Sequence, residues 1–151
     1  MRTVKGDLLK LAAAGEFDVI IHGCNCFHTM GAGIAKSIKQ RFPDAFAADL
    51  ETEMGSRAKL GSFSSATVDC DGRALTIVNA YTQFDMGGRR INADYDAIRS
   101  VFRKIKSTFP GKRIGYPMIG AGLAGGDWNV ISRIINEELN GENHTLVEYQ
   151  P

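Results

Sequence analysis

The segment IIHGCNCFHTMGAGIAKSIKQRFP, residues 20–43, joins an apolar strand to an amphipathic helix through a loop rich in glycine. Ile34, Ile38 and Phe42 repeat at helical spacing, and Pro43 ends the predicted helix. The preceding stretch FDVIIHG is continuously apolar, which is typical of a strand buried on both faces of a parallel sheet. A buried strand, a glycine loop and a helix in this order predict an α/β fold.

The rest of the chain continues the alternation of strands and helices. Residues 64–81 read as two strands joined at Asp71-Gly72, a strong signal for a hairpin turn. Further strands are predicted at residues 2–7, 112–119 and 144–149, and helices at residues 7–15, 43–55, 94–109 and 127–141. The sheet should therefore be mostly parallel with one hairpin. No composition shift, linker or repeat divides the sequence, so we expect one domain over residues 1–151.

Composition excludes several classes of function. The 18 Lys and Arg residues nearly balance the 17 Asp and Glu residues, and this net charge of +1 gives no electrostatic basis for binding duplex nucleic acid. No run of eighteen apolar residues and no signal-peptide core are present, so we expect a cytoplasmic protein without a membrane partner. Three cysteines in such a chain do not suggest a disulfide framework.

Two glycine-rich turns each follow a predicted strand and precede a predicted helix. They are MGAGIA at residues 30–35 and GAGLAGGDW at residues 120–128. Ligands of open α/β sheets bind beyond the carboxyl ends of the strands, where a helix start offers N–H groups and a partial positive charge. One such loop suits a phosphate, and two facing loops suit a diphosphate.

The second turn also fits a dinucleotide-binding fingerprint. Gly120, Gly122 and Gly125 have the required spacing, and Glu148 ends the next predicted strand, where a ribose-binding acid would lie. That fingerprint belongs to a first βαβ unit, however, whereas here it comes late in the sequence. We therefore favour a diphosphate loop over a nicotinamide-binding domain.

His22, Cys24, Cys26 and His28 alternate along the first turn and resemble a zinc set. Structural zinc ligands usually come as C-x-x-C with a second distant pair, because a turn must bring them together. We favour a buried strand for His22 and Cys24 and loop positions for the other two, and we expect no metal site and no cofactor. A Cys–His hydrolase is the other alternative, although Cys26 has no obvious third group to orient a base.

Five segments in this order resemble those of a macrodomain: GD after the first strand, IIHGCNCFHTMGAGIA, VNAYTQ, YPMIGAGLAGGDW and the terminal VEY. The resemblance covers nearly the whole chain, and it is greatest for the branch of ADP-ribose 1″-phosphate phosphatases and terminal ADP-ribose glycohydrolases. It implies a three-layer α/β/α fold with a mixed, mostly parallel sheet. It also implies that ADP-ribose binds across the top of that sheet.

The resemblance assigns roles to individual residues. Asp7 would accept a hydrogen bond from the adenine amino group, although capping of the first helix is an equally compatible role. Asn25 would lie near the distal ribose or be a turn residue. Tyr149 would flank adenine or cover the sheet edge. The two diphosphate loops would consist of Gly31, Ala32, Gly33 and Ile34, and of Gly120, Ala121, Gly122 and Leu123.

Catalysis is less well marked than binding. Ala124 stands where the resembled glycohydrolases carry an acid, and VNAYTQ has no lysine where they carry a covalent partner. His22 matches a histidine of the phosphatase-like relatives but belongs to the buried strand. Phosphate-ester cleavage needs a proton donor and a positioned water, and we assign these roles to His28 and Asp127. The alternatives are a plain loop residue for His28 and a helix cap for Asp127.

These residues lead to three expectations. The first is a protein that binds ADP-ribose and removes the terminal phosphate of ADP-ribose 1″-phosphate. The second is a hydrolase that removes ADP-ribose from a modified protein or nucleic acid. The third is a reader that binds ADP-ribose groups on macromolecules without cleaving them.

Overall fold

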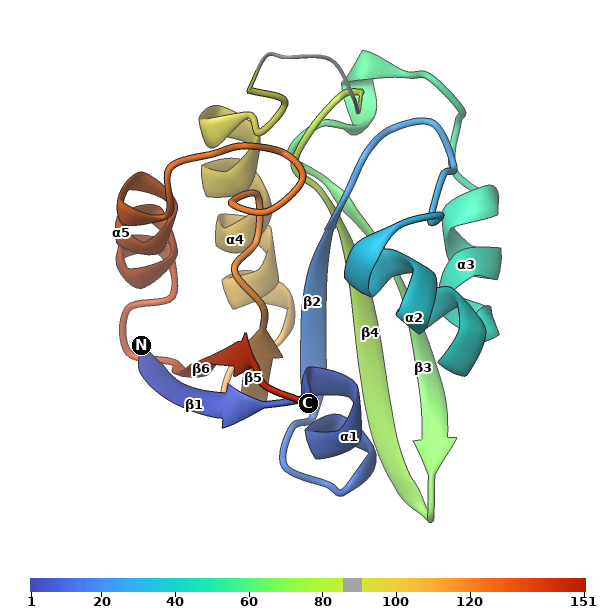
Figure 1. Ribbon diagram of the computed structural model, residues 1–151, viewed down its shortest axis with the longest axis vertical. Coiled ribbons are helices and arrows are strands. Elements are labelled where there is room, and N and C mark those ends of the chain that lie inside the picture. The colour runs from blue at the N-terminus through green and yellow to red at the C-terminus, as the bar shows by residue number, and fades with distance from the viewer. Residues whose placement is uncertain (86–90) are drawn as a thin grey trace.

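The computed structural model describes residues 1–85 and 91–151, which form one six-stranded sheet with helices on both faces (Figure 1). The strand order is β1-β6-β5-β2-β4-β3, and every neighbouring pair is parallel except the antiparallel hairpin β3–β4. The strands are β1 (Arg2–Gly6), β2 (Val19–Cys24), β3 (Phe63–Cys70), β4 (Arg73–Tyr81), β5 (Arg113–Tyr116) and β6 (Asn143–Tyr149). This arrangement confirms the mixed, mostly parallel sheet.

The helices form the outer two layers of a three-layer α/β/α molecule. They are α1 (Leu8–Ala13), α2 (Gly33–Arg41), α3 (Pro43–Leu50), α4 (Tyr95–Thr108) and α5 (Trp128–Glu138), with a short 3₁₀ turn, η1 (Arg57–Lys59). α4 and α5 pack on one face of the sheet, and α1, α2 and α3 pack on the other. Within the described ranges, no helix has the length and apolar content needed to cross a membrane.

The alternation of side chains along β2 builds both cores. Val19 and Ile21 pack under α4 and α5, whereas Ile20 packs with α1, α2 and α3. All three are fully or almost fully buried, as expected for a central strand that is covered on both faces. Because β2 is central, its carboxyl end at Cys24 opens in the middle of the upper edge of the sheet.

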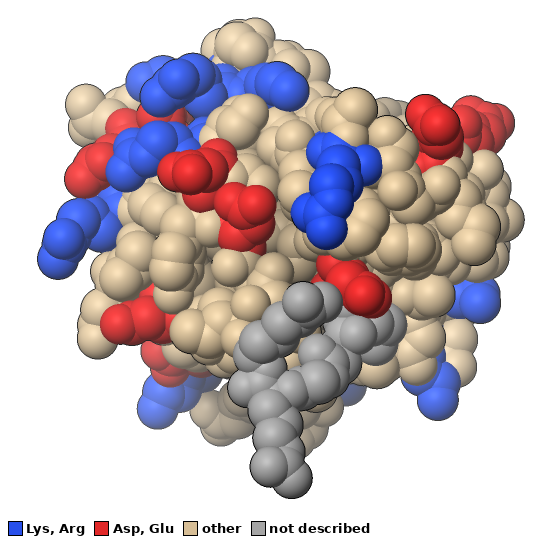
Figure 2. Space-filling view, turned by 90° about the horizontal axis from the view of Figure 1, so that it is seen from above, with Lys and Arg blue, Asp and Glu red and all other residues tan. Residues whose placement is uncertain are grey.

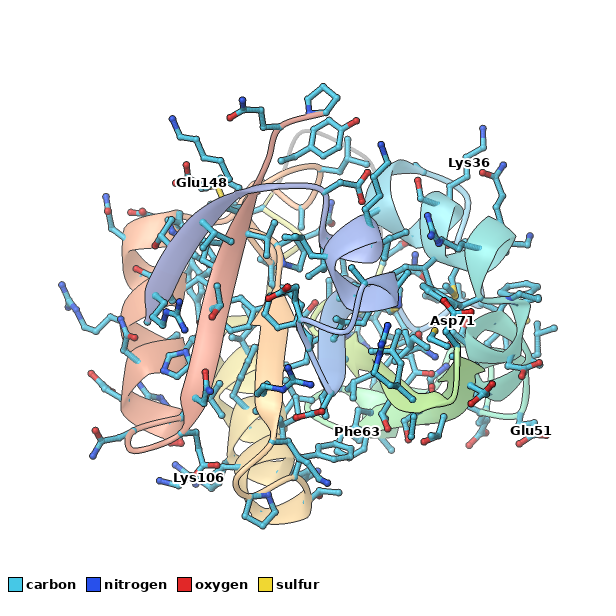
Figure 3. The ribbon with its side chains drawn as sticks, turned by 90° about the horizontal axis from the view of Figure 1, so that it is seen from below. Lys36, Glu51, Phe63, Asp71, Lys106 and Glu148 are labelled. Atoms are coloured by element: carbon cyan, nitrogen blue, oxygen red, sulfur yellow. The ribbon has the colours of Figure 1, made fainter. Side chains whose placement is uncertain are left out.

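α3 and β5 both end earlier than the sequence pattern predicted. α3 ends at Leu50, and residues 51–55 turn back toward the loop after β2, where the Gly55 N–H donates to Cys26 O at 2.7 Å. β5 ends at Tyr116 because Pro117 has no N–H with which to continue the ladder. The hairpin turn has the predicted position, and Figure 3 shows Asp71 at its tip and Phe63 at the start of β3.

Candidate functional site

The two glycine loops come together at the carboxyl ends of two adjacent strands. β2 pairs in parallel with β5, so the chain leaves both strands on the same side of the sheet. We call residues 31–34 the first glycine loop and residues 120–127 the second. A Cβ placed on Gly33 would lie 3.8 Å from Cδ1 of Leu123, so the loops face each other across a narrow gap.

Backbone N–H groups are the principal donors around this gap. Among the described residues, the N–H groups of Gly122, Leu123 and Ala124 have no hydrogen-bond partner. On the other side, α2 begins after Ala32, whose side chain makes no cap, so the first-turn N–H groups of a nine-residue helix are also available. Such donors suit a phosphate or a diphosphate.

No lysine or arginine lies within either glycine loop. Lys36, the nearest cation in sequence to the first loop, is exposed and projects outward from α2 (Figure 3). Figure 2 shows charges of both signs interspersed on this end of the molecule, with no large patch of one sign. An anion between the loops would therefore be held mainly by backbone dipoles.

A pocket of about 350 Å³ adjoins the first glycine loop. Its walls combine residues from β1, α1, α2 and the end of β6: Gly6, Asp7, Leu8, Leu9, Gly33, Ile34, Ser37, Pro117, Val147 and Tyr149. The size and the largely apolar lining suit a flat heterocycle. A larger depression of about 650 Å³ runs along the outer face of α5, but it is wide open and polar and lies outside the sheet edge, so we do not regard it as a site.

Both residues that were predicted to contact adenine, Asp7 and Tyr149, line this pocket. Asp7 caps α1, since its Oδ1 accepts hydrogen bonds from Leu9 N at 3.0 Å and Lys10 N at 3.1 Å. Oδ2 takes no part in this cap. Tyr149 is 75% exposed at the pocket rim, so its ring is free to cover a ligand.

Asn25 shapes the loop between β2 and the first glycine loop. Its Oδ1 accepts from Phe27 N at 2.8 Å, and its Nδ2 donates to Thr29 Oγ1 at 2.5 Å. The residue is only 8% exposed. These contacts show that Asn25 stabilises the turn.

His28 is held against the turn that follows α3. Its Nε2 lies 2.8 Å from Thr52 O and 3.1 Å from Thr52 Oγ1, and its φ of 60° is in the left-handed region. A carbonyl oxygen only accepts, so Nε2 carries a proton and Nδ1 is the other nitrogen of the neutral ring. Nδ1 can accept a proton in that state and can donate one only as imidazolium.

Asp127 is the N-cap of α5, as the sequence allowed. Its carboxylate accepts from Asn129 N at 2.9 Å, and its own N–H donates to the Tyr95 hydroxyl at 3.0 Å. The neighbouring Ala124 is buried, and its carbonyl oxygen accepts from the N–H groups of Asn92 and Ala93. In the structure, Asp127 lies at the end of the second glycine loop. His28 lies in the segment before the first glycine loop, on the side of α3.

Of the alternating histidines and cysteines, His22, Cys24 and Cys26 are buried, and Cys24 Sγ lies 3.5 Å from His22 Nε2. His22 is fully buried with Nε2 at 2.7 Å from Asn79 Oδ1, and burial lowers the pKa of its ring to about 4. Burial also raises the pKa of the Cys24 and Cys26 thiols, which disfavours thiolates. The described residues contain no group of three or more metal-binding side chains.

The sequence analysis did not predict a buried polar cluster that packs against the segment between β2 and the first glycine loop. The Tyr81 hydroxyl donates to Asp49 Oδ1 at 2.7 Å, the Thr52 hydroxyl donates to Asp49 O, and Lys59 Nζ donates to Cys26 O at 3.2 Å. Asp49 and Lys59 are 1% and 7% exposed. An aspartate and a lysine in polar segments carry no local signal of burial, so only the assembled fold reveals them.

Comparison with known structures identifies the fold of this chain. The macrodomain of Thermus aquaticus DarG is 22% identical and superimposes with a TM-score of 0.70, covering 99% of this chain and 97% of that one. The chain has the macrodomain fold. The strand order described above is thus that of a chain with the macrodomain fold.

Two macrodomain-fold structures contain ADP-ribose. Thermosipho africanus DarTG in complex with ADP-ribose has a TM-score of 0.73 at 16% identity, with 98% of this chain and 42% of that chain covered. The Trypanosoma brucei macrodomain in complex with ADP-ribose has a TM-score of 0.63 at 18% identity, with 97% and 62% covered.

Sequence comparison adds two relatives, whereas no family model matches this chain. An uncharacterised 17.5 kDa protein from the tk-vs intergenic region of enterobacteria phage T4 is 35% identical over 156 residues, which cover 100% of this chain and 97% of that protein. The chain belongs to the same family as this phage protein. An ADP-ribose 1″-phosphate phosphatase of Aspergillus oryzae is 39% identical over 46 residues, 30% of this chain and 21% of that enzyme.

Proposed function

We propose that this macrodomain binds ADP-ribose along the upper edge of its sheet. Adenine would occupy the pocket of about 350 Å³ beside Asp7 and Tyr149, and the diphosphate would lie between the two glycine loops. The distal ribose would then reach the loop that contains Asn25. The observation that carries the proposal is the pairing of a heterocycle-sized pocket with facing N–H donors that have no partner in the described chain.

Calorimetric titration with ADP-ribose tests this proposal. We expect a dissociation constant on the order of micromolar, equivalent to about −8 kcal/mol. AMP should bind far more weakly because it lacks the second phosphate and the distal ribose, and NAD should bind weakly because its nicotinamide enlarges the distal end. Binding of NAD as tightly as ADP-ribose would favour the dinucleotide-binding alternative instead.

A second candidate function is removal of the terminal phosphate from ADP-ribose 1″-phosphate. It is supported by the 46-residue match to an enzyme of that name and by Ala124, which can neither protonate a leaving group nor activate water. In this reaction water attacks phosphorus, the bond from phosphorus to the ribose oxygen breaks, and that oxygen receives a proton. Loop N–H groups would stabilise the phosphate oxygens.

The proposed roles of His28 and Asp127 in this reaction require variants that keep the backbone in place. His28→Asn suits the left-handed φ of 60°, and Asp127→Asn retains a capping side chain. We expect His28→Asn to lower turnover by roughly a hundredfold, the scale of one general acid, with ADP-ribose affinity little changed.

The same assay separates the remaining alternatives. Phosphate release that survives both substitutions would remove the catalytic assignments. Binding without phosphate release by the wild type would leave a reader of ADP-ribose groups. Release of ADP-ribose from glutamate-modified protein would favour the glycohydrolase alternative, which we do not expect because Ala124 is buried and uncharged.

A further inference from the structure

A short segment outside the predicted site runs along the second glycine loop. We call residues 91–95 the clamp segment. Its N–H groups at Asn92 and Ala93 donate to Ala124 O at 2.9 and 3.3 Å. The segment is also hydrogen-bonded to the residues that follow β4. The Asp94 N–H donates to Thr82 O at 2.8 Å, and Ala93 pairs with Gln83 as an isolated β-bridge. The clamp segment therefore links the second glycine loop to the sheet.

Ala93 also packs where the two ends of that loop meet. The Gly126 N–H donates to Gly120 O at 2.7 Å, which closes the loop on itself. A Cβ on Gly126 would lie 2.6 Å from Gly120 O and 3.0 Å from the Ala93 Cβ, and one on Gly120 would lie 3.4 Å from the same atom. Position 126 therefore requires glycine, because any side chain there would clash with the carbonyl oxygen of Gly120.

Tyr95 makes the last contact between the clamp segment and the loop. Its hydroxyl accepts a hydrogen bond from Asp127 N at 3.0 Å, at the residue where the loop becomes α5. Its ring packs against the core beneath α4 and α5. Tyr95 does not line the pocket beside Asp7.

We infer that Tyr95 is a positioning residue, which holds the second glycine loop so that the N–H groups of Gly122, Leu123 and Ala124 stay available together for a diphosphate. A loop that is ordered before binding loses less conformational entropy when the ligand arrives. The assignment of a diphosphate ligand rests on the proposed function. The effect of the Tyr95 hydroxyl on the conformation of the loop does not rest on the proposed function. The conformational effect and the effect on ligand binding are therefore tested in separate experiments.

The first experiment needs no ligand. Tyr95→Phe removes the acceptor of the Asp127 N–H and keeps the ring in the core. Amide hydrogen exchange followed by NMR should show the Asp127 N–H exchanging about tenfold faster or more, with smaller increases at residues 120–126. Tyr116→Phe is the matched control, because it removes a hydroxyl that bonds to His144 at 2.6 Å, away from the loop. Unchanged exchange at Asp127 in Tyr95→Phe would overturn the inference.

The second experiment asks whether the loop shape matters for affinity. Titration of Tyr95→Phe should give about a three- to tenfold weaker binding of ADP-ribose, the scale of one lost hydrogen bond. Adenosine, which lacks phosphates, should bind Tyr95→Phe as it binds the wild type. Equal losses for both ligands would indicate a general loss of structure, and an unchanged ADP-ribose affinity would remove the functional role of Tyr95. If the wild type does not bind ADP-ribose, the proposed function fails and the exchange experiment still decides the positioning role.

Discussion

Asp7 carries two roles that substitution can separate. One carboxylate oxygen caps α1 through Leu9 N and Lys10 N, and the other oxygen takes no part in the cap. Asparagine caps helices about as well as aspartate, but it can place an amide donor where the second oxygen stood. The substitution Asp7→Asn therefore spares the helix and repels an adenine amino group.

We predict that Asp7→Asn weakens ADP-ribose binding by roughly tenfold, the scale of one charge-assisted hydrogen bond, with an unchanged melting temperature. Asp7→Ala should lose affinity and also about 1 kcal/mol of stability through the missing cap. Calorimetry and thermal unfolding of both variants check this. If Asp7→Asn binds like the wild type, Asp7 is a helix cap and no more.

Gly122 is the better position at which to block the proposed diphosphate site. Gly33 has a φ of +57°, so a side chain there would strain the backbone as well as approach the ligand. Gly122 has no such φ, and a Cβ there meets nothing within 4 Å. Gly122→Glu therefore adds a negative charge at the second glycine loop without straining the backbone or causing a steric clash.

We predict that Gly122→Glu lowers ADP-ribose affinity by more than about a hundredfold, because the carboxylate competes for the same N–H donors and repels the diphosphate. The control Asn140→Glu changes an exposed residue two positions beyond the end of α5, so it adds the same charge away from the loops and should bind ADP-ribose normally. Both variants should melt near the wild type. Retained affinity in folded Gly122→Glu would move the anion to another part of the molecule.

The helices that follow the two glycine loops begin in different ways. α2 has Ala32 at its N-cap position and so no side-chain cap, whereas α5 is capped by Asp127. The sequence predicted that both loops offer a helix start to the anion. In the structure the helix start belongs to the first loop, and the second loop contributes N–H groups that precede its helix.

This difference gives a prediction in which stability and affinity change in opposite directions. Ala32 has extended dihedrals of −144° and 156°, which suit a capping residue. Ala32→Asp should cap α2 and raise the free energy of unfolding by about 0.5–1 kcal/mol, while its carboxylate takes the place of the phosphate and weakens ADP-ribose binding at least tenfold. Ala32→Ser, a cap without charge, should lose less affinity. Unfolding in urea and calorimetry measure the two effects, and equal affinity in all three proteins would place the anion away from α2.

The cap of α5 should act mainly on stability. Asp127→Ala removes the acceptor of the Asn129 N–H and should cost about 1 kcal/mol, whereas Asp127→Asn should cost a few tenths. Equilibrium unfolding in urea of the two variants checks the difference. A larger loss of stability in Asp127→Asn than in Asp127→Ala would contradict the capping role.

The packing of the whole sheet makes stability depend on pH through His22. Burial lowers the ring pKa from 6.5 to about 4, so between these values the unfolded state binds more protons than the folded state. The stability linked to His22 is therefore complete above pH 6.5 and is lost as the pH falls toward 4. Burial lowers the pKa of His144 in the same direction.

We predict that the free energy of unfolding falls between pH 6.5 and 5, with a limit of about 1.4 kcal/mol per pH unit for each buried histidine. Urea unfolding at several pH values measures this slope. NMR titration should show the His22 ring signals constant from pH 7.5 to 5. A His22 ring that titrates near pH 6.5 would mean that it is hydrated rather than buried.

The sequence alone determined the elements and their order, because the signals involved act over a few residues. Asp7 caps the helix that follows it, Asp71-Gly72 turns the hairpin, and the apolar run before Cys24 is a central strand. The two glycine loops were located in the same way, since a loop between a buried strand and a helix is visible in the local pattern. Parallel pairing of β2 and β5 then places both loops at one edge of the sheet.

Only the tertiary structure decided what the polar side chains around these loops do. The tautomer of His28 depends on Thr52, 24 positions away, and the hydrogen-bond partner of the His22 ring is Asn79, 57 positions away. Tyr95 reaches Asp127 across 32 positions. Each contact joins separate elements, so its partner cannot be read from spacing along the chain. The physical reason is that a hydrogen-bonding group takes its role from whichever donor or acceptor the packed helices and strands bring within about 3 Å of it.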